Sequence, residues 1–173
     1  MDFLRNLRAF RKASGQTLSV FWDQYGVTES GGGLYERGRA MPGSLTILLA
    51  LVHTGRITLD HLRYARRFCR EEGIQDAALN RFEAQILQLE AHRLDLLLNQ
   101  SDFWWHFGTC QSSGSRYVKG RVVPNPTRML LALYFSKIVS LETLAATIYL
   151  FKAITSNGLT SNSPVRFTGM FKP

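Results

Sequence analysis

The sequence is poor in cysteine and lacks metal-ligand patterns. Of its 173 residues only two are cysteines, Cys69 and Cys110, and they form no CxxC pair. The four histidines also lack the spacing of metal ligands. We therefore expect no metal site and no disulfide framework, and the simplest interpretation is a reducing interior in which both thiols stay unpaired.

Long apolar runs are absent as well. The apolar stretch LTILLALV (residues 45–52) is far short of the ~20 residues that span a bilayer, and it indicates a core helix. The basic beginning of the chain, MDFLRNLRAFRK, lacks the apolar stretch and the cleavage site of a secretory signal. These absences predict a cytoplasmic protein without a membrane partner.

Catalytic signatures are also missing. The sequence contains no nucleophile elbow, no phosphate-binding loop and no HExxH motif. We expect no enzymatic activity, no catalytic residues and no cofactor.

Acidic residues are scarce relative to basic ones. The chain has 13 Asp and Glu residues against 21 Lys and Arg residues, which gives a formal charge of +8. Clustered basic side chains favour a polyanionic partner, because they release counterions from phosphate. A basic protein whose charges are simply solvated is the alternative at this point.

What the sequence does contain is an internal repeat. When Trp22 is placed over Trp104, an offset of 82 residues, the segments 19–62 and 101–144 align without a gap. Sixteen of the 44 aligned positions are identical, whereas unrelated segments would share roughly three at normal residue usage. The chain is therefore a duplicated unit.

Helical spacing, cap residues and breakers predict four or five short helices in each copy. Apolar spacing without Gly or Pro extends through residues 74–98 and predicts a helical segment that joins the copies. The expected units are residues 1–72 and 73–155, and the Ser-, Asn- and Gly-rich residues 156–173 are expected to form a flexible tail. In the first copy, the expected helices cover residues 3–12, 17–25, 28–37 and 44–53, and a fifth begins after Thr58.

The segment FWDQYGVTESGGGLYERGRAMP resembles the lambda-repressor-like (Xre-type) helix-turn-helix family. The shared pattern is a helix, then Gly-Val-Thr/Ser, a short polar reading helix, Tyr-Glu-x-Gly-Arg and a Pro. The resemblance covers residues 17–62 and again 99–144. It implies an all-α fold with two helix-turn-helix units in tandem. It also implies that the reading helix of each unit enters the major groove of double-stranded DNA.

Both copies depart from the family pattern at one helix crossing. The family places a small residue on the second helix and an aliphatic residue ten positions later on the reading helix. Here these positions hold Trp22 and Gly32 in the first copy, and Trp104 and Gly114 in the second. A large ring against a glycine conserves the filled volume, so we predict that each tryptophan packs on its glycine. The flanking Gly31 and Gly33 are serines in the second copy, so we expect no packing role for them.

The resemblance also implies which residues meet DNA. Arg116 and Gln111 can pair with guanine and adenine, and the second copy is therefore expected to be the stronger base reader. Helical spacing also predicts that the arginines at positions 63, 66, 67 and 70 share one helix face. This face either contacts DNA phosphates or is simply solvated. The candidate base readers are Thr28, Glu29, Ser30, Gln111, Ser112, Ser113, Ser115 and Arg116, and the candidate phosphate contacts are Arg37, Arg39, Lys119 and Arg121.

These observations favour a sequence-specific transcriptional regulator of a bacterium, phage or plasmid. The duplication implies that one chain carries the two reading helices which a dimer usually provides, and the chain itself or another regulator is a possible further partner. Two alternatives remain. One is a protein-interaction module that acts on another regulator or on polymerase. The other is an accessory factor in recombination or plasmid maintenance.

Overall fold

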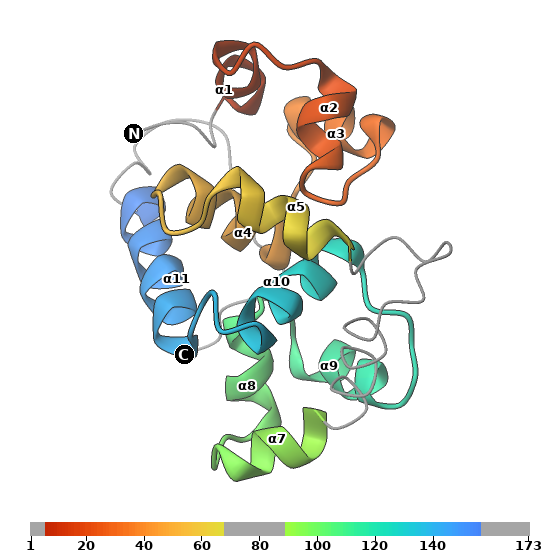
Figure 1. Cartoon of the computed structure of the whole chain (residues 1–173), viewed down its shortest axis with the longest axis vertical. Helices are drawn as coiled ribbons and strands as arrows, with labels where there is room; N and C mark the ends of the chain where they lie inside the picture. Colours follow the sequence, from red (N-terminus) through yellow and green to blue (C-terminus); the bar gives the residue numbers. More distant parts are fainter. Residues whose placement is uncertain (1–5, 68–88, 157–173) are drawn as a thin grey trace.

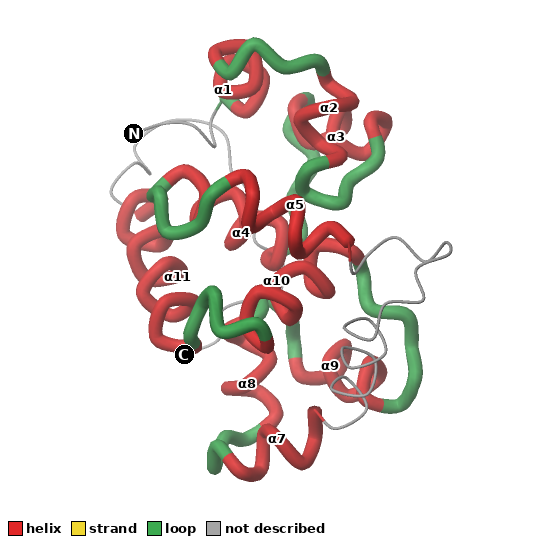
Figure 2. Tube along the Cα trace, viewed as in Figure 1, coloured by secondary structure: helices red, strands yellow, loops and turns green. Residues whose placement is uncertain are grey.

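The computed structural model describes residues 6–67 and 89–156, and side chains as far as residue 153. These residues form helices and loops and contain no strand, as Figure 2 shows. The all-α prediction is therefore confirmed. The helices are α1 (Leu7–Ala13), α2 (Leu18–Asp23), α3 (Glu29–Glu36), α4 (Gly43–His53), α5 (Leu59–Arg67), α7 (Leu89–Asp95), α8 (Gln100–His106), α9 (Gln111–Val118), α10 (Asn125–Phe135) and α11 (Leu141–Ser156).

Some expectations concern residues outside this description. The boundary expected between residues 72 and 73 lies outside it, and so does most of the joining helix predicted over residues 74–98. Of its described residues 89–98 only α7 is helical, because the chain turns after Asp95 where Leu97 has a φ of +55°. Residues 157–173 of the expected tail also lie outside the described residues, while Ser156 is the last residue of α11.

Polar side chains begin the short helices where the sequence predicts. Thr17 Oγ1 accepts a hydrogen bond from Val20 N at the start of α2, and Thr28 Oγ1 accepts one from Gly31 N at the start of α3. These caps satisfy amide groups that a helix leaves without partners at its N-terminus. Gly26 has a φ of +70°, and the chain turns there between α2 and α3.

The predicted contact between tryptophan and glycine is present in both copies. Trp22 and Trp104 are almost fully buried, and a Cβ atom built on Gly32 or Gly114 would overlap Cδ1 and Cγ of the tryptophan ring. Glycine is therefore the residue that lets each ring lie directly on the reading helix.

The two copies share one core through their fourth and fifth helices. Helix α4 packs against α10, α5 packs against α10, and α11 packs against α4. The fifth helix of each copy therefore covers the fourth helix of the other copy. In Figure 1, α1–α3 lie toward one end of the long axis and α7–α9 toward the other, with α4, α5, α10 and α11 between them. Leucines from both copies fill this centre, among them Leu45, Leu48, Leu49, Leu130, Leu131 and Leu133.

One aromatic pair exchanges its members between the copies. Phe10 stacks edge-on against His53, with ring centroids 5.4 Å apart. At the equivalent positions His92 lies against Phe135 at 5.7 Å, and His92 Nε2 also forms a 2.8 Å hydrogen bond with the hydroxyl of Tyr134. The ring pair is thus retained although each residue type has moved to the opposite helix.

Candidate DNA interface

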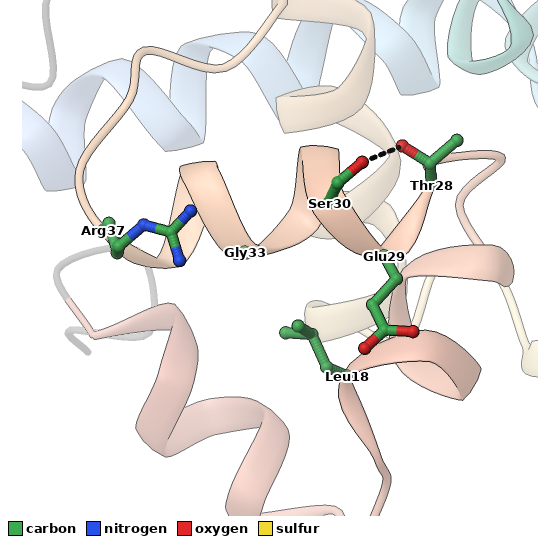
Figure 3. A pocket seen from close by; sticks show the side chains of 6 residues that line it. All are labelled: Leu18, Thr28, Glu29, Ser30, Gly33 and Arg37. Atoms are coloured by element: carbon green, nitrogen blue, oxygen red, sulfur yellow. Dashed lines mark hydrogen bonds between the residues drawn. The ribbon is translucent and has the colours of Figure 1, made fainter.

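The first residues of α3 carry three of the expected base readers. Thr28, Glu29 and Ser30 are all exposed. The hydroxyl groups of Thr28 and Ser30 lie 3.3 Å apart and are hydrogen bonded. Figure 3 shows that the Glu29 side chain points toward Leu18, away from these two hydroxyl groups. The N-terminus of α3 therefore presents a pair of hydroxyl groups and a separate carboxylate.

A groove runs along the exposed side of α3 (Figure 3). Its lining includes Leu18, Glu29, Gly33 and Arg37. Gly33 is buried, because the Leu18 side chain and the guanidinium of Arg37 lie over it. Gly33 is therefore covered by neighbouring side chains, but packing does not require a glycine there, as the sequence predicts. A Cβ atom at Gly33 would meet Leu18 Cδ2 at an ordinary 3.5 Å, which agrees with Ser115 at the equivalent position.

Helix α9 offers more polar side chains than α3. Gln111, Ser112 and Arg116 are exposed, whereas Ser113 and Ser115 are half-buried. The three exposed side chains lie on one short helix and can donate and accept hydrogen bonds, as base readout requires. The arrangement agrees with the expectation that the second copy is the stronger base reader, which stays a prediction.

Cys110 lies at the N-cap of α9, where the first copy has Thr28. Its Sγ lies 3.3 Å from the hydroxyl oxygens of both Ser112 and Ser113. Hydrogen bonds with these hydroxyl groups lower the pKa of the Cys110 thiol to about 7. The sequence reasoning did not place Cys110 at the interface, although its alignment with the capping Thr28 was the signal that could have done so.

The loops after the reading helices position the expected phosphate contacts in the same way in both copies. Arg39 N donates to Leu34 O at 3.0 Å, and Arg121 N donates to Arg116 O at 2.9 Å. Each arginine follows a glycine with positive φ, +97° in the first copy and +93° in the second. The four expected phosphate contacts, Arg37, Arg39, Lys119 and Arg121, are all exposed.

The arginines of α5 do not act as one stripe. Arg63 pairs with the exposed Asp60, whereas Arg66 donates to the backbone oxygen and the carboxylate of Asp23 at 3.0 and 2.9 Å. Arg67 is exposed, and residue 70 lies outside the described part of the chain. Arg66 therefore holds α5 against the end of α2, so the interpretation of the stripe as a common phosphate contact is wrong for this residue.

The described residues offer neither a metal-ligand cluster nor a membrane-spanning helix. No group of three or more His, Cys, Asp or Glu side chains there could hold a metal ion. Nor does any helix among them have the length and apolarity to cross a membrane.

Comparison with known families bears on these paired units. The family model described as the RsaL-like HTH domain matches the chain twice, over residues 8–52 and 90–134. The two segments together make up more than half of the chain. The chain belongs to the RsaL-like helix-turn-helix family. No curated protein and no solved structure matched it.

The two RsaL-like domains start and end at the same 82-residue offset as the internal repeat. They run from the first to the fourth helix of each copy, α1–α4 and α7–α10. The predicted tandem duplication of helix-turn-helix units is confirmed, and the matching family is the RsaL-like one. Helices α5 and α11, which pack across the copies, follow the matched segments.

Proposed function

We propose that this protein is a sequence-specific transcriptional regulator that applies two RsaL-like helix-turn-helix domains of one chain to one DNA site. The observation that carries the proposal is the pairing itself. Two complete helix-turn-helix units share a core through α4 and α10, and each presents an exposed reading helix. In such proteins a pair of reading helices enters successive major grooves about 34 Å apart. A single chain with two units needs no second copy for this.

The site read by the chain is asymmetric, because α3 and α9 differ at most exposed positions. Helix α9 carries Gln111 and Arg116, which suit adenine and guanine respectively. Helix α3 offers Glu29 and the hydroxyl groups of Thr28 and Ser30. A carboxylate can accept a hydrogen bond from a cytosine amino group but is repelled by phosphate. We therefore expect the first unit to make fewer attractive contacts with DNA.

Two variants of the second unit separate base reading from phosphate binding. Duplexes bound by the full chain are first selected from a random pool, and each variant is then titrated against the preferred and a scrambled duplex at several salt concentrations. We expect Arg116→Ala to weaken binding to the preferred duplex by about 1–3 kcal/mol, with binding to the scrambled duplex unchanged. Arg121→Ala is expected to weaken binding to both duplexes and to flatten the salt dependence by about one unit.

The outcomes of this titration are distinct. If Arg116→Ala weakens both duplexes equally, the second unit does not read bases through that side chain. If the selection yields no preferred duplex, the chain is not a sequence-specific regulator, and the alternatives of protein interaction or accessory DNA binding gain support.

A further inference from the structure

The turn of the first helix-turn-helix unit is held by a side chain of the second unit. Asn125, the first residue of α10, donates from Nδ2 to the backbone oxygen of Gly26 at 3.3 Å. The two backbones are close at this point. A Cβ atom built on Gly26 would lie 2.8 Å from Asn125 Cβ and 3.2 Å from Sδ of Met129. The turn that sets the direction of α3 therefore rests directly on α10.

A second polar contact holds the same region. The guanidinium of Arg66 on α5 binds the backbone oxygen and the carboxylate of Asp23, the last residue of α2. The Arg66 side chain is 18% exposed and the Asp23 side chain 50%, so solvent screens this pair in part and the hydrogen-bond geometry at Arg66 fixes its direction. Because α5 also packs on α10, both contacts join the α2–α3 segment of the first unit to the same part of the centre.

The second unit has no equivalent of these contacts. At the 82-residue offset, Asn125 corresponds to Gly43, Arg66 to Ile148 and Asp23 to Trp105. Trp105 instead packs against Tyr149 of α11, with ring centroids 5.6 Å apart. At this place the α2–α3 segment of the first unit is held by directional hydrogen bonds, and the equivalent segment of the second unit by aromatic packing.

We propose that Asn125, supported by Arg66, is a positioning residue that sets the separation and angle of α3 relative to α9, and hence the half-site spacing that the protein accepts. This inference rests on the proposed function. One added base pair moves a half-site by about 3.4 Å along the duplex and rotates it by roughly a tenth of a turn. If the first unit is held rigidly, the protein binds half-sites at only one spacing. If the unit is loosened, the protein also binds half-sites that are one or two base pairs closer or farther apart.

The test uses the full chain and a series of selected duplexes in which the spacing between half-sites changes from minus two to plus two base pairs. Asn125→Asp removes the N–H donor at nearly constant shape and places a carboxylate oxygen against the Gly26 carbonyl oxygen. Because an acidic residue suits the first turn of a helix, the melting temperature should fall only slightly and the chain should stay folded. Arg66→Ile introduces the residue that the second unit carries. Tyr64→Phe is the control, because it removes the 3.0 Å contact between Tyr64 and the Ser136 hydroxyl, which does not touch the turn.

We expect the unaltered chain to bind one spacing best. Asn125→Asp and Arg66→Ile should retain that affinity within about twofold but reduce the penalty for neighbouring spacings by about two- to tenfold, the range of one lost hydrogen bond. Tyr64→Phe should keep the original profile. If Asn125→Asp and Arg66→Ile both keep the original dependence of affinity on spacing, the positioning role is wrong and the proposed function stands. If the unaltered chain itself shows no dependence on spacing, the two-groove reading in the proposed function is wrong as well.

Discussion

At the scale of single residues, two glycines explain how each reading helix is mounted. Gly32 and Gly114 each lie beneath a fully buried indole ring, and no side chain fits between ring and helix. Glycine inside a helix costs about 1 kcal/mol relative to alanine. The burial of the tryptophan offsets this cost, because the ring of a Phe or Trp contributes several kcal/mol to a core.

Gly32→Ile should overpack this crossing and destabilise the protein by about 1–3 kcal/mol. Gly33→Ala is the matched control one residue away, because its new Cβ atom meets Leu18 Cδ2 at an ordinary distance. The control should be neutral or more stable by up to about 1 kcal/mol, since alanine is the better helix former. Urea unfolding of both variants tests the difference, and equal stabilities for Gly32→Ile and the unaltered chain would refute the packing argument.

The sequence alone predicts the contact between tryptophan and glycine at this helix crossing, but it does not predict the packing around it. The pairing of Trp22 with Gly32 could be predicted because the duplication repeats the same exchange of sizes at Trp104 and Gly114. The burial of Gly33 could not, because it depends on where the Leu18 and Arg37 side chains lie. Their directions are set by tertiary packing rather than by local pattern.

At the scale of elements, an ion pair joins α1 to the reading helix in the first unit only. Arg11 Nε binds Glu36 Oε1 at 2.7 Å, and Trp22 Nε1 donates to the same oxygen at 3.0 Å. Burial alone would raise the pKa of the Glu36 carboxyl, but the hydrogen bonds from Arg11 and Trp22 outweigh it and lower the pKa. In the second unit Val118 occupies the position of Glu36. Arg93 there pairs with Glu90 of its own helix at 2.6 Å, and only its Nε is buried without a hydrogen-bond partner.

Val118→Glu should supply an acceptor for the unpartnered Arg93 Nε in the second unit. We expect a gain of about 1 kcal/mol at neutral pH, from one hydrogen bond to a charged group less the lost contacts of valine. A carboxylate paired in this way has a depressed pKa in the folded state, so the gain is present above the unfolded pKa and is lost as the pH falls through the folded one. Thermal unfolding of Val118→Glu and Val118→Gln at pH 7 and pH 3 measures this. A Val118→Glu variant that is less stable than Val118→Gln at pH 7 would contradict the account.

At the scale of the whole molecule, the fifth helices make the two units one body. The repeat and the helix-turn-helix motif follow from sequence pattern, and the two matches to the family model bear them out. The packing of α5 on α10 and of α11 on α4 does not follow from it. A fifth helix with one apolar face can pack on the fourth helix of its own unit or on that of the other unit. The sequence pattern of the apolar face is the same for both arrangements, so it does not distinguish them. For the same reason the sequence did not predict the contact of Asn125 with Gly26 or that of Arg66 with Asp23.

This shared core predicts that the described units unfold together. Leu62 on α5 is 1% exposed, and Leu62→Ala should lower the stability by about 2–5 kcal/mol. Since α5 packs on α10, the opening free energy measured by amide hydrogen exchange should fall by the same amount in α10 as in α4. Exchange in α10 that keeps its original protection would show that the units open independently.

We propose above that one chain places two reading helices in successive major grooves of one duplex. Hydroxyl-radical footprinting of the selected duplex, at a measured stoichiometry of bound chains, tests it most directly. We expect one bound chain to protect two windows on the same face of the duplex, centred about 10 base pairs apart. Arg121→Ala should weaken the protection of one window more than that of the other. A single protected window per chain, or two windows that appear only when two chains are bound, would contradict the account.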